Sequence, residues 1–286
     1  SLIAAGLILE GNGDFTLSGV SNAIGTVATA GTVGSIVLEN STGLTIGSLG
    51  AASGLSAVGD ISVSTTSAEG LRVRQSIFSQ GGEISLNAPS IQVDGATVAS
   101  TAGAPVTLTA RQLVLLNQPI INGVLRGFGS AAALTLDDSG LTTGQSYVIG
   151  AESITAGSRT YVFQNVSAIR LELGPGNDLS DTNFFTFDQF LNAGGGTNQL
   201  LVGGNPVTSS PLTRPGFGTI TFSGFVLAPP PPPPPTVVAA NIPTAVPPFG
   251  AFLLQNAVPV GNAGSNAASQ TNNFTSSAAA SASLAA

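Results

Sequence analysis

The chain has 286 residues, of which only 7% are charged and 37 are glycine, and its formal net charge is −7. All seven basic residues are arginine, so a basic surface for nucleic acid or anionic lipid is not expected. Cysteine and histidine are absent, which excludes disulfides, thiolate chemistry, cysteine-type zinc sites and most catalytic triads.

The first apolar stretch runs from Leu2 to Leu9 and is interrupted by Gly6. It is much shorter than the roughly 18 residues that a membrane-spanning helix needs, so no membrane insertion is expected. Because the sequence has no methionine, Ser1 is not expected to be the translation start, and a signal peptide would be compatible with the region before it.

A repeat is visible between residues 82 and 116. Residues 82–94 align with residues 104–116 at an offset of 22 residues, and the offset superimposes apolar residues that alternate with polar ones. The matched pairs are Ile84 with Val106, Leu86 with Leu108, Ile91 with Leu113, Val93 with Leu115, and Val98 with Ile120. Such alternation predicts short strands with one buried face.

The preceding residues show the same pattern with looser spacing. The apolar pairs there are Ile36/Leu38, Leu44/Ile46, Ile61/Val63 and Leu71/Val73, followed by Ile77. One such unit cannot bury its apolar face alone, whereas stacked units about 4.8 Å apart build a continuous core. The repeat therefore predicts a parallel β-helix, with an antiparallel sandwich as the second interpretation. Stacking also predicts that Arg74 lies over Asp94.

The segment Gly34-Ser-Ile-Val-Leu-Glu-Asn-Ser-Thr-Gly-Leu-Thr-Ile46 and residues 82–116 resemble the repeat region of filamentous haemagglutinin-like exoproteins of bacteria. The resemblance covers roughly the first 125 residues. It implies a right-handed β-helix in the extracellular space or on the bacterial cell surface, in a family with many adhesins. The secretion domain that such proteins carry near the N-terminus is not visible in this sequence.

From about residue 131 the predicted strands become longer, at residues 133–136, 146–149, 159–163 and 168–173. This region either continues the solenoid or caps it. The expected organisation is all-β: a right-handed parallel β-helix over residues 1–130, a β-rich continuation or cap over 131–228, a proline linker over 229–235 and an extended tail over 236–286.

Two glycine-rich turns follow in the chain. Gly174-Pro-Gly-Asn-Asp178 resembles one turn of the calcium repeats of secreted bacterial proteins, and residues 193–198 do so more weakly, with Asn198 replacing the aspartate. Asp178 would supply a hard oxygen ligand to calcium, but six to eight such oxygens are needed. A tight turn without metal is the alternative interpretation. No other cofactor is expected.

Residues 183–190 concentrate aromatic side chains that the rest of the chain lacks. A plug of the core is the default interpretation, but four phenylalanines are too many for one strand face, so some are expected to contact a neighbouring subunit. They are Phe184, Phe185, Phe187 and Phe190.

Seven consecutive prolines occupy residues 229–235 and favour an extended polyproline II spacer. The run would also suit a proline-binding groove, although modules of that kind are not expected as partners of an extracellular bacterial fibre. The tail beyond is expected to dock on a neighbouring copy, giving a homo-oligomer or polymer, or else to pack along its own solenoid. Its apolar anchors would be Ile242, Phe249, Phe252, Leu253, Leu254, Val258 and Val260.

These features favour a non-enzymatic extracellular structural protein, a subunit of a self-assembling surface fibre or adhesive filament whose tail links the subunits. The alternatives are a monomeric adhesin or glycan-binding fragment and, less favoured, a polysaccharide lyase or glycosidase with clustered carboxylates. Asp137 and Asp138 are the only adjacent acidic pair, expected at a solvated corner, and Asp60 and Glu83 are expected on one outer face. Asn40, Asn165 and Asn273 begin N-glycosylation sequons.

Overall fold

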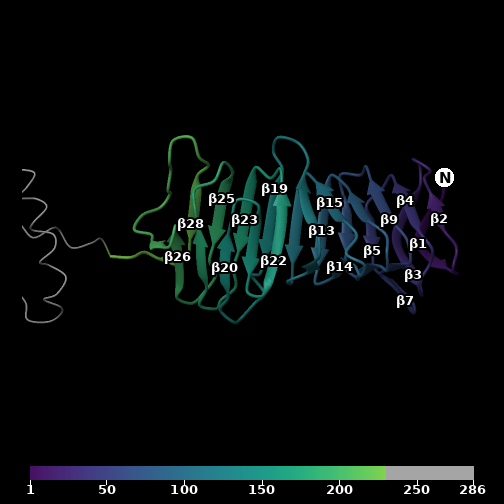
Figure 1. Ribbon diagram of the computed structural model, residues 1–286, viewed down its shortest axis with the longest axis horizontal. Helices are drawn as coiled ribbons and strands as arrows, with labels where there is room; N and C mark the ends of the chain where they lie inside the picture. The colour runs from purple at the N-terminus through teal and green to yellow at the C-terminus, as the bar shows by residue number, and fades with distance from the viewer. Residues whose placement is uncertain (230–286) are drawn as a thin grey trace, which may run out of the picture. The chain divides into compact units, whose positions relative to one another are not determined.

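The computed structural model describes residues 1–229, in which the elements of regular secondary structure are β-strands (Figure 1). The described residues contain no helix that is long and apolar enough to cross a membrane. Their strands form sheets of ten, thirteen, four and two members, and all of them belong to one compact unit. The predicted all-β class is confirmed.

The strands follow one another in repeated units that lie side by side along the molecule; we call each unit a rung and their succession the stack. The ten-stranded sheet is parallel throughout and extends from the first rungs to the last. Its strands, in spatial order, are β1 (Ile3–Glu10), β3 (Ala23–Ala30), β5 (Leu44–Ile46), β10 (Leu71–Val73), β13 (Ser90–Asp94), β16 (Gln112–Leu116), β19 (Ala133–Asp137), β23 (Ala168–Glu172), β25 (Asp188–Asn192) and β28 (Ile220–Ser223).

The thirteen-stranded sheet is mostly parallel, with antiparallel pairing only at β22–β21–β20 and β26–β27 among the described strands. In spatial order it contains β2 (Phe15–Leu17), β4 (Ile36–Asn40), β9 (Ile61–Thr65), β12 (Ile84–Asn87), β15 (Val106–Ala110), β18 (Val124–Gly127), β22 (Arg159–Gln164), β21 (Ser153–Ala156), β20 (Ser146–Ile149), β24 (Leu179–Thr182), β26 (Asn198–Val202) and β27 (Asn205–Pro206), while β29 (Phe225–Val226) pairs with β26.

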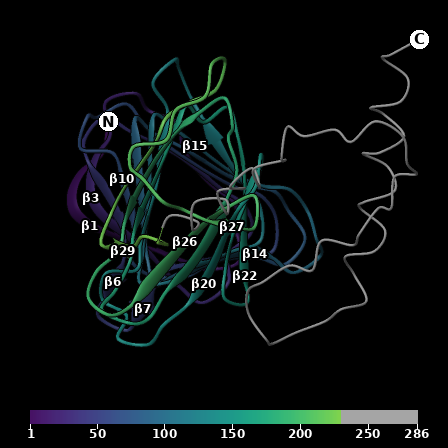
Figure 2. The same cartoon turned by 90° about the vertical axis from the view of Figure 1, so that its left-hand side faces the viewer.

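A parallel four-stranded sheet completes the first half, and a small separate hairpin packs against β3. The sheet contains β8 (Leu55–Ala57), β11 (Ile77–Ser79), β14 (Thr97–Ser100) and β17 (Ile120–Ile121), and the hairpin contains β6 (Ser48–Leu49) and β7 (Ala52–Ser53). From β4 to β18 the chain visits the three larger sheets in turn. After β18 it alternates between the two largest, so residues 131–228 continue the stack. Viewed along the stack, the sheets surround the interior (Figure 2).

Equivalent strands pair in the register that the 22-residue repeat predicts. Between β12 and β15, Ile84 pairs with Val106 and Leu86 with Leu108. The predicted pairs between β13 and β16 are also present. The side chains of all these apolar pairs are buried, because parallel stacking places equivalent inward positions of successive rungs next to one another.

The predicted pairing of Val98 with Ile120 is wrong by one residue. Val98 pairs with Ile121, which is buried, while Ile120 is 47% exposed. The corner before β17 holds one residue more than the corner before β14, and Asn117 and Gln118 take left-handed backbone conformations there, with φ values of 54° and 53°. The extra corner residue shifts the register without disturbing the strands on either side.

The register of β10 and β13, which pairs Val73 with Val93, places Arg74 next to Asp94 as predicted, but the two side chains form no ion pair in the described structure. Among the residues that the structure describes, the ion pair formed is Arg170–Glu172, on the outer face of β23. Asp94 instead accepts a hydrogen bond from the side-chain amide of Asn117, one rung further along. An exposed ion pair contributes little, so a neighbouring amide competes with it readily.

Stacking also explains why Gly54, at the corner before β8, is glycine. Its φ is +65°, and a Cβ atom there would overlap the backbone oxygen of Ser76 in the next rung. Gly50 has a similar φ of +62°, but a Cβ at that position would meet open space. Close rung-to-rung approach therefore requires glycine at position 54, while turn conformation alone favours it at position 50.

Candidate functional site

Asp178, the predicted calcium ligand, lies inside the corner between β23 and β24. Its side chain is 3% exposed. Its Oδ1 atom accepts a hydrogen bond from the backbone N–H of Gln145 at 2.8 Å, and its Oδ2 atom has no partner among the described residues. Asn198, the second and weaker match to the calcium repeat, occupies the next rung and accepts the backbone N–H of Asp178 at 2.8 Å. Calcium binding at this corner stays a prediction.

Asparagine occupies three other inside corners in the same way. The Oδ1 atoms of Asn22, Asn40 and Asn198 each accept a backbone N–H from the preceding rung at 2.8 Å. All three side chains are at least 96% buried, with exposures of 4%, 3% and 0%. These side chains therefore fasten neighbouring rungs at the corners, as the carboxylate of Asp178 does through Oδ1.

Asp178 differs from these asparagines in its second terminal atom. The Nδ2 atom of Asn22 donates to the carbonyl of Leu17, that of Asn40 to Thr42, and that of Asn198 to Gly195, at 2.9, 2.9 and 3.0 Å. A carboxylate has no such donor. The missing N–H accounts for the unpartnered Oδ2 atom of Asp178.

The sequon at Asn40 is therefore not a modification site in the folded protein. Its amide is buried and both of its terminal atoms are engaged. The sequon asparagine at position 165 is exposed, and Asn273 lies outside the described residues.

Asp138 is buried, so the expectation of a solvated corner is wrong for this residue. Its side chain is 2% exposed, and its Oδ2 atom accepts a hydrogen bond from the Tyr147 hydroxyl at 3.0 Å. Its Oδ1 atom has no partner among the described residues. Asp137 points to the opposite face of the strand, as neighbouring strand residues do, and accepts the backbone N–H of Ser139 at 3.0 Å. The hydrogen bond from Tyr147, in β20, partly compensates the cost of burying the Asp138 carboxyl group.

Burial raises the pKa of both buried carboxyl groups. At Asp138 desolvation is the largest effect, and the Tyr147 hydrogen bond and the charge of Arg159 offset part of it. At Asp178 desolvation is again the largest effect, offset in part by the hydrogen bond from the Gln145 backbone. Desolvation and the nearby Asp138 carboxylate also raise the pKa of the Tyr147 hydroxyl.

These shifts predict that the protein is more stable in mild acid than at neutral pH. A carboxyl group with a raised pKa in the folded state contributes its full stability below the unfolded pKa of about 3.9 and loses it as the pH rises through the folded pKa. Each group lowers the free energy of unfolding by up to about 1.4 kcal/mol per pH unit in that window. Urea unfolding at a series of pH values from mild acid to neutrality measures the slope. Asp138→Asn and Asp178→Asn should each flatten it, and a stability that rises over this range would contradict the prediction.

The carboxylate of Asp60, considered above as part of an outer acidic pair, binds the neighbouring rung. Its Oδ1 atom accepts the backbone N–H of Glu83 at 2.8 Å. Asp14 binds Ser35 in the same way at 2.7 Å, and Asp188 binds Thr219 at 2.9 Å. These residues each stand at the start of a strand, where the carboxylate fixes the register of the next rung.

The four phenylalanines predicted as an interface are divided between the core and the surface. Phe187 is 5% exposed and contacts the Phe163 ring edge-on, with 5.7 Å between the ring centroids, so it is removed from the predicted interface. Phe184 and Phe185 are half-buried and pack against the core. Phe190 faces outward at 36% exposure. The seven predicted tail anchors, from Ile242 to Val260, lie outside the described residues.

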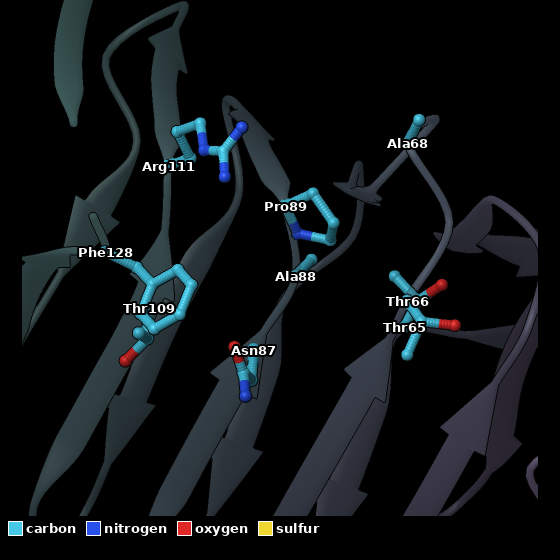
Figure 3. A pocket seen from close by; sticks show the side chains of 9 residues that line it. All are labelled: Thr65, Thr66, Ala68, Asn87, Ala88, Pro89, Thr109, Arg111 and Phe128. Carbon is cyan, nitrogen blue, oxygen red and sulfur yellow. The ribbon is translucent and has the colours of Figure 1, made fainter. Parts of the chain in front are cut away.

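An apolar groove of about 630 Å³ lies along the corner where β9, β12, β15 and β18 end (Figure 3). We call it the corner groove; its lining residues are Thr65, Thr66, Ala68, Asn87, Ala88, Pro89, Thr109, Arg111 and Phe128. Phe128 is 64% exposed, and Arg111 is the single charged residue of the lining. The groove thus combines an exposed aromatic ring with amide, hydroxyl and guanidinium groups.

Backbone hydrogen bonds between rungs hold the groove residues in place. Asn87 and Thr109 are paired across β12 and β15. Beyond them, the backbone N–H of Arg111 donates to the Pro89 carbonyl at 3.1 Å, and that of Phe128 donates to the Ala110 carbonyl at 2.9 Å. Ala88 lines the groove at the inward corner position that Asn40 and Thr65 occupy in earlier rungs.

A second, smaller hollow surrounds Phe190 on the outer face of the ten-stranded sheet. The guanidinium of Arg170 lies 5.2 Å from the centre of the Phe190 ring and pairs with Glu172. Asn192 donates to Glu172 at 2.7 Å and accepts from Ser223 at 2.9 Å. This Phe190 patch joins an aromatic face to a network of polar groups.

Sequence reasoning did not find either hollow. The corner groove gathers residues from position 65 to position 128, and no local motif connects them. The sequence did contain one relevant signal, the 22-residue offset, which places Asn87 over Thr109.

Comparison of the chain with protein-family models, curated proteins and solved structures finds no match. The resemblance to filamentous haemagglutinin-like proteins therefore rests on the repeat residues alone.

Proposed function

We propose that the described unit is a right-handed parallel β-helix and that the chain is an extracellular structural protein of a bacterial cell surface. In this proposal the chain is a subunit of a self-assembling fibre, and the tail links one subunit to the next. The parallel ladders of the two largest sheets support the solenoid. Fewer than a tenth of the residues are charged, which suits a protein whose polar surface consists of hydroxyl, amide and backbone groups.

The observation that carries the fibre proposal is the position of exposed apolar side chains. Ile3 and Val20, in the first rungs, are each 80% exposed, and Val226 and Leu227, in the last rungs, are 57% and 45% exposed. Apolar surface at both ends of a stack favours end-to-end contact between copies, because association would remove it from water. A head-to-tail contact of this kind is heterologous and extends into a filament.

Electron microscopy of the intact chain tests the proposal. Regular filaments are expected for the intact chain, and single particles for a chain truncated after Pro235. Val20→Lys should abolish filaments, while Val58→Lys should retain them, because Val58 is comparably exposed (55%) in a rung between the two ends. Single particles in the intact sample at every concentration would contradict the proposal.

A monomeric adhesin that binds glycans is the second candidate, and the Phe190 patch is the observation that favours it. An aromatic face beside arginine, glutamate and asparagine side chains suits a sugar ring, which stacks on the aromatic face and hydrogen-bonds through its hydroxyl groups. Saturable binding of oligosaccharides to the intact chain, lost in Phe190→Ala, would support this candidate.

A further inference from the structure

The corner groove has the chemistry of a proline-binding surface. Its walls are mostly apolar, with the exposed ring of Phe128 and the ring of Pro89 among them. Its polar groups include the donors Arg111 and Asn87, and none of its lining residues carries a carboxylate. A ligand that fits the groove therefore has apolar ring surfaces and accepts hydrogen bonds, and it has few N–H or O–H groups of its own that would need acceptors on the protein. Polyproline matches this description, since proline has a free carbonyl and no backbone N–H.

The chain itself contains such a ligand in residues 229–235. At about 3.1 Å per residue in the polyproline II conformation, seven prolines extend about 22 Å. The corner groove crosses four rungs, from β9 to β18, which is three spacings of about 4.8 Å, or about 14 Å. The proline run is therefore long enough to fill the groove.

The run of the same copy does not reach far enough. Pro229 follows β29, which pairs with the far edge of β26, so six strand spacings separate β29 from β18 in the thirteen-stranded sheet. Six spacings of about 4.8 Å amount to about 29 Å, so the run would end before it reached the nearest edge of the groove. The occupant is thus expected to come from another copy.

We propose that the corner groove of one copy binds the seven-proline run of a neighbouring copy. This inference rests on the proposed tail-mediated assembly and adds a second contact to it, made by the proline linker that precedes the tail, so the tail is still required for filaments. The Phe128 ring packs against proline rings, while Arg111 and Asn87 donate to proline carbonyls. The extended run is already restricted in conformation, so little conformational entropy is lost when it binds.

The test uses the full-length chain with its seven prolines replaced by serine, so that no internal run competes, and a fluorescently labelled heptaproline peptide as the probe. Saturable binding is expected, with the dissociation constant raised about tenfold or more in Phe128→Ala and in Arg111→Ala. Phe78→Ala is the matched control, because Phe78 is 40% exposed on the four-stranded sheet, outside the groove. It should leave binding unchanged.

Equal binding to the Phe128→Ala variant, or no binding at millimolar peptide, would overturn the inference. So would binding of an acidic oligosaccharide in the groove without any heptaproline binding, which would identify a glycan site instead. The two proposals fail separately. Filaments that persist after the prolines are replaced would leave the fibre standing and remove the groove contact. Heptaproline binding without filaments in any sample would support the groove contact and contradict the fibre proposal.

Discussion

At pH 7, replacing Asp178 by asparagine should raise the free energy of unfolding by about 1–3 kcal/mol. The buried Oδ2 atom of Asp178 has no partner among the described residues, whereas the Nδ2 atoms of Asn22, Asn40 and Asn198 all donate to carbonyl oxygens. An asparagine at position 178 would keep the bond from Gln145 and gain such a donor. It would also remove a carboxyl group whose ionisation burial opposes. Urea unfolding followed by circular dichroism measures the change.

The reverse substitution is the matched control. Asn198→Asp places a carboxyl group in the next rung of the same corner and should lower stability at pH 7 by a similar amount. Repeating both measurements with added calcium separates the two roles of Asp178. If calcium stabilises the native chain but not Asp178→Asn, the carboxylate holds a cation and the prediction of a stabilising substitution is contradicted.

Alternation along the chain predicted the strands because it is a local property, and the 22-residue repeat predicted how the strands stack. A residue of β12 and its partner in β15 occupy equivalent places in successive units, so the spacing that aligns Leu86 with Leu108 in the sequence also pairs them in the sheet. The number of residues in a corner follows no such rule. One additional residue with left-handed backbone geometry at Asn117 and Gln118 is enough to expose Ile120 and bury Ile121.

The inward polar residues were beyond sequence reasoning for a related reason. Whether a carboxylate or amide points inward depends on partners that the adjacent sequence does not reveal. Asp138 is held by Tyr147, which belongs to an antiparallel excursion of β20, β21 and β22 that interrupts the parallel pattern. Asn40 begins a sequon in the sequence, but its partners are Ile24, in a strand of another sheet, and Thr42, beyond the corner.

The corner groove illustrates the same limit at the level of the site. Its aromatic residue, Phe128, follows β18, and its first hydroxyl residues, Thr65 and Thr66, are contributed by the end of β9. The four rungs become neighbours only through stacking. Once the ladder is known, however, the register that pairs Asn87 with Thr109 shows which residues lie together along the groove.

Asn40→Ala should lower the free energy of unfolding by about 1–3 kcal/mol for the loss of the Ile24 N–H partner alone. The backbone N–H of Ile24 donates to Oδ1 of Asn40 at 2.8 Å, and Ile24 is fully buried, so water cannot replace the lost acceptor without opening the corner. The carbonyls of Ile24 and Thr42 would also lose their amide donor. Asn122→Ala is the matched control, since Asn122 is exposed, and a change within about 0.5 kcal/mol is expected there. Equal unfolding midpoints for the two variants would show that the corner asparagine does not fasten the rungs.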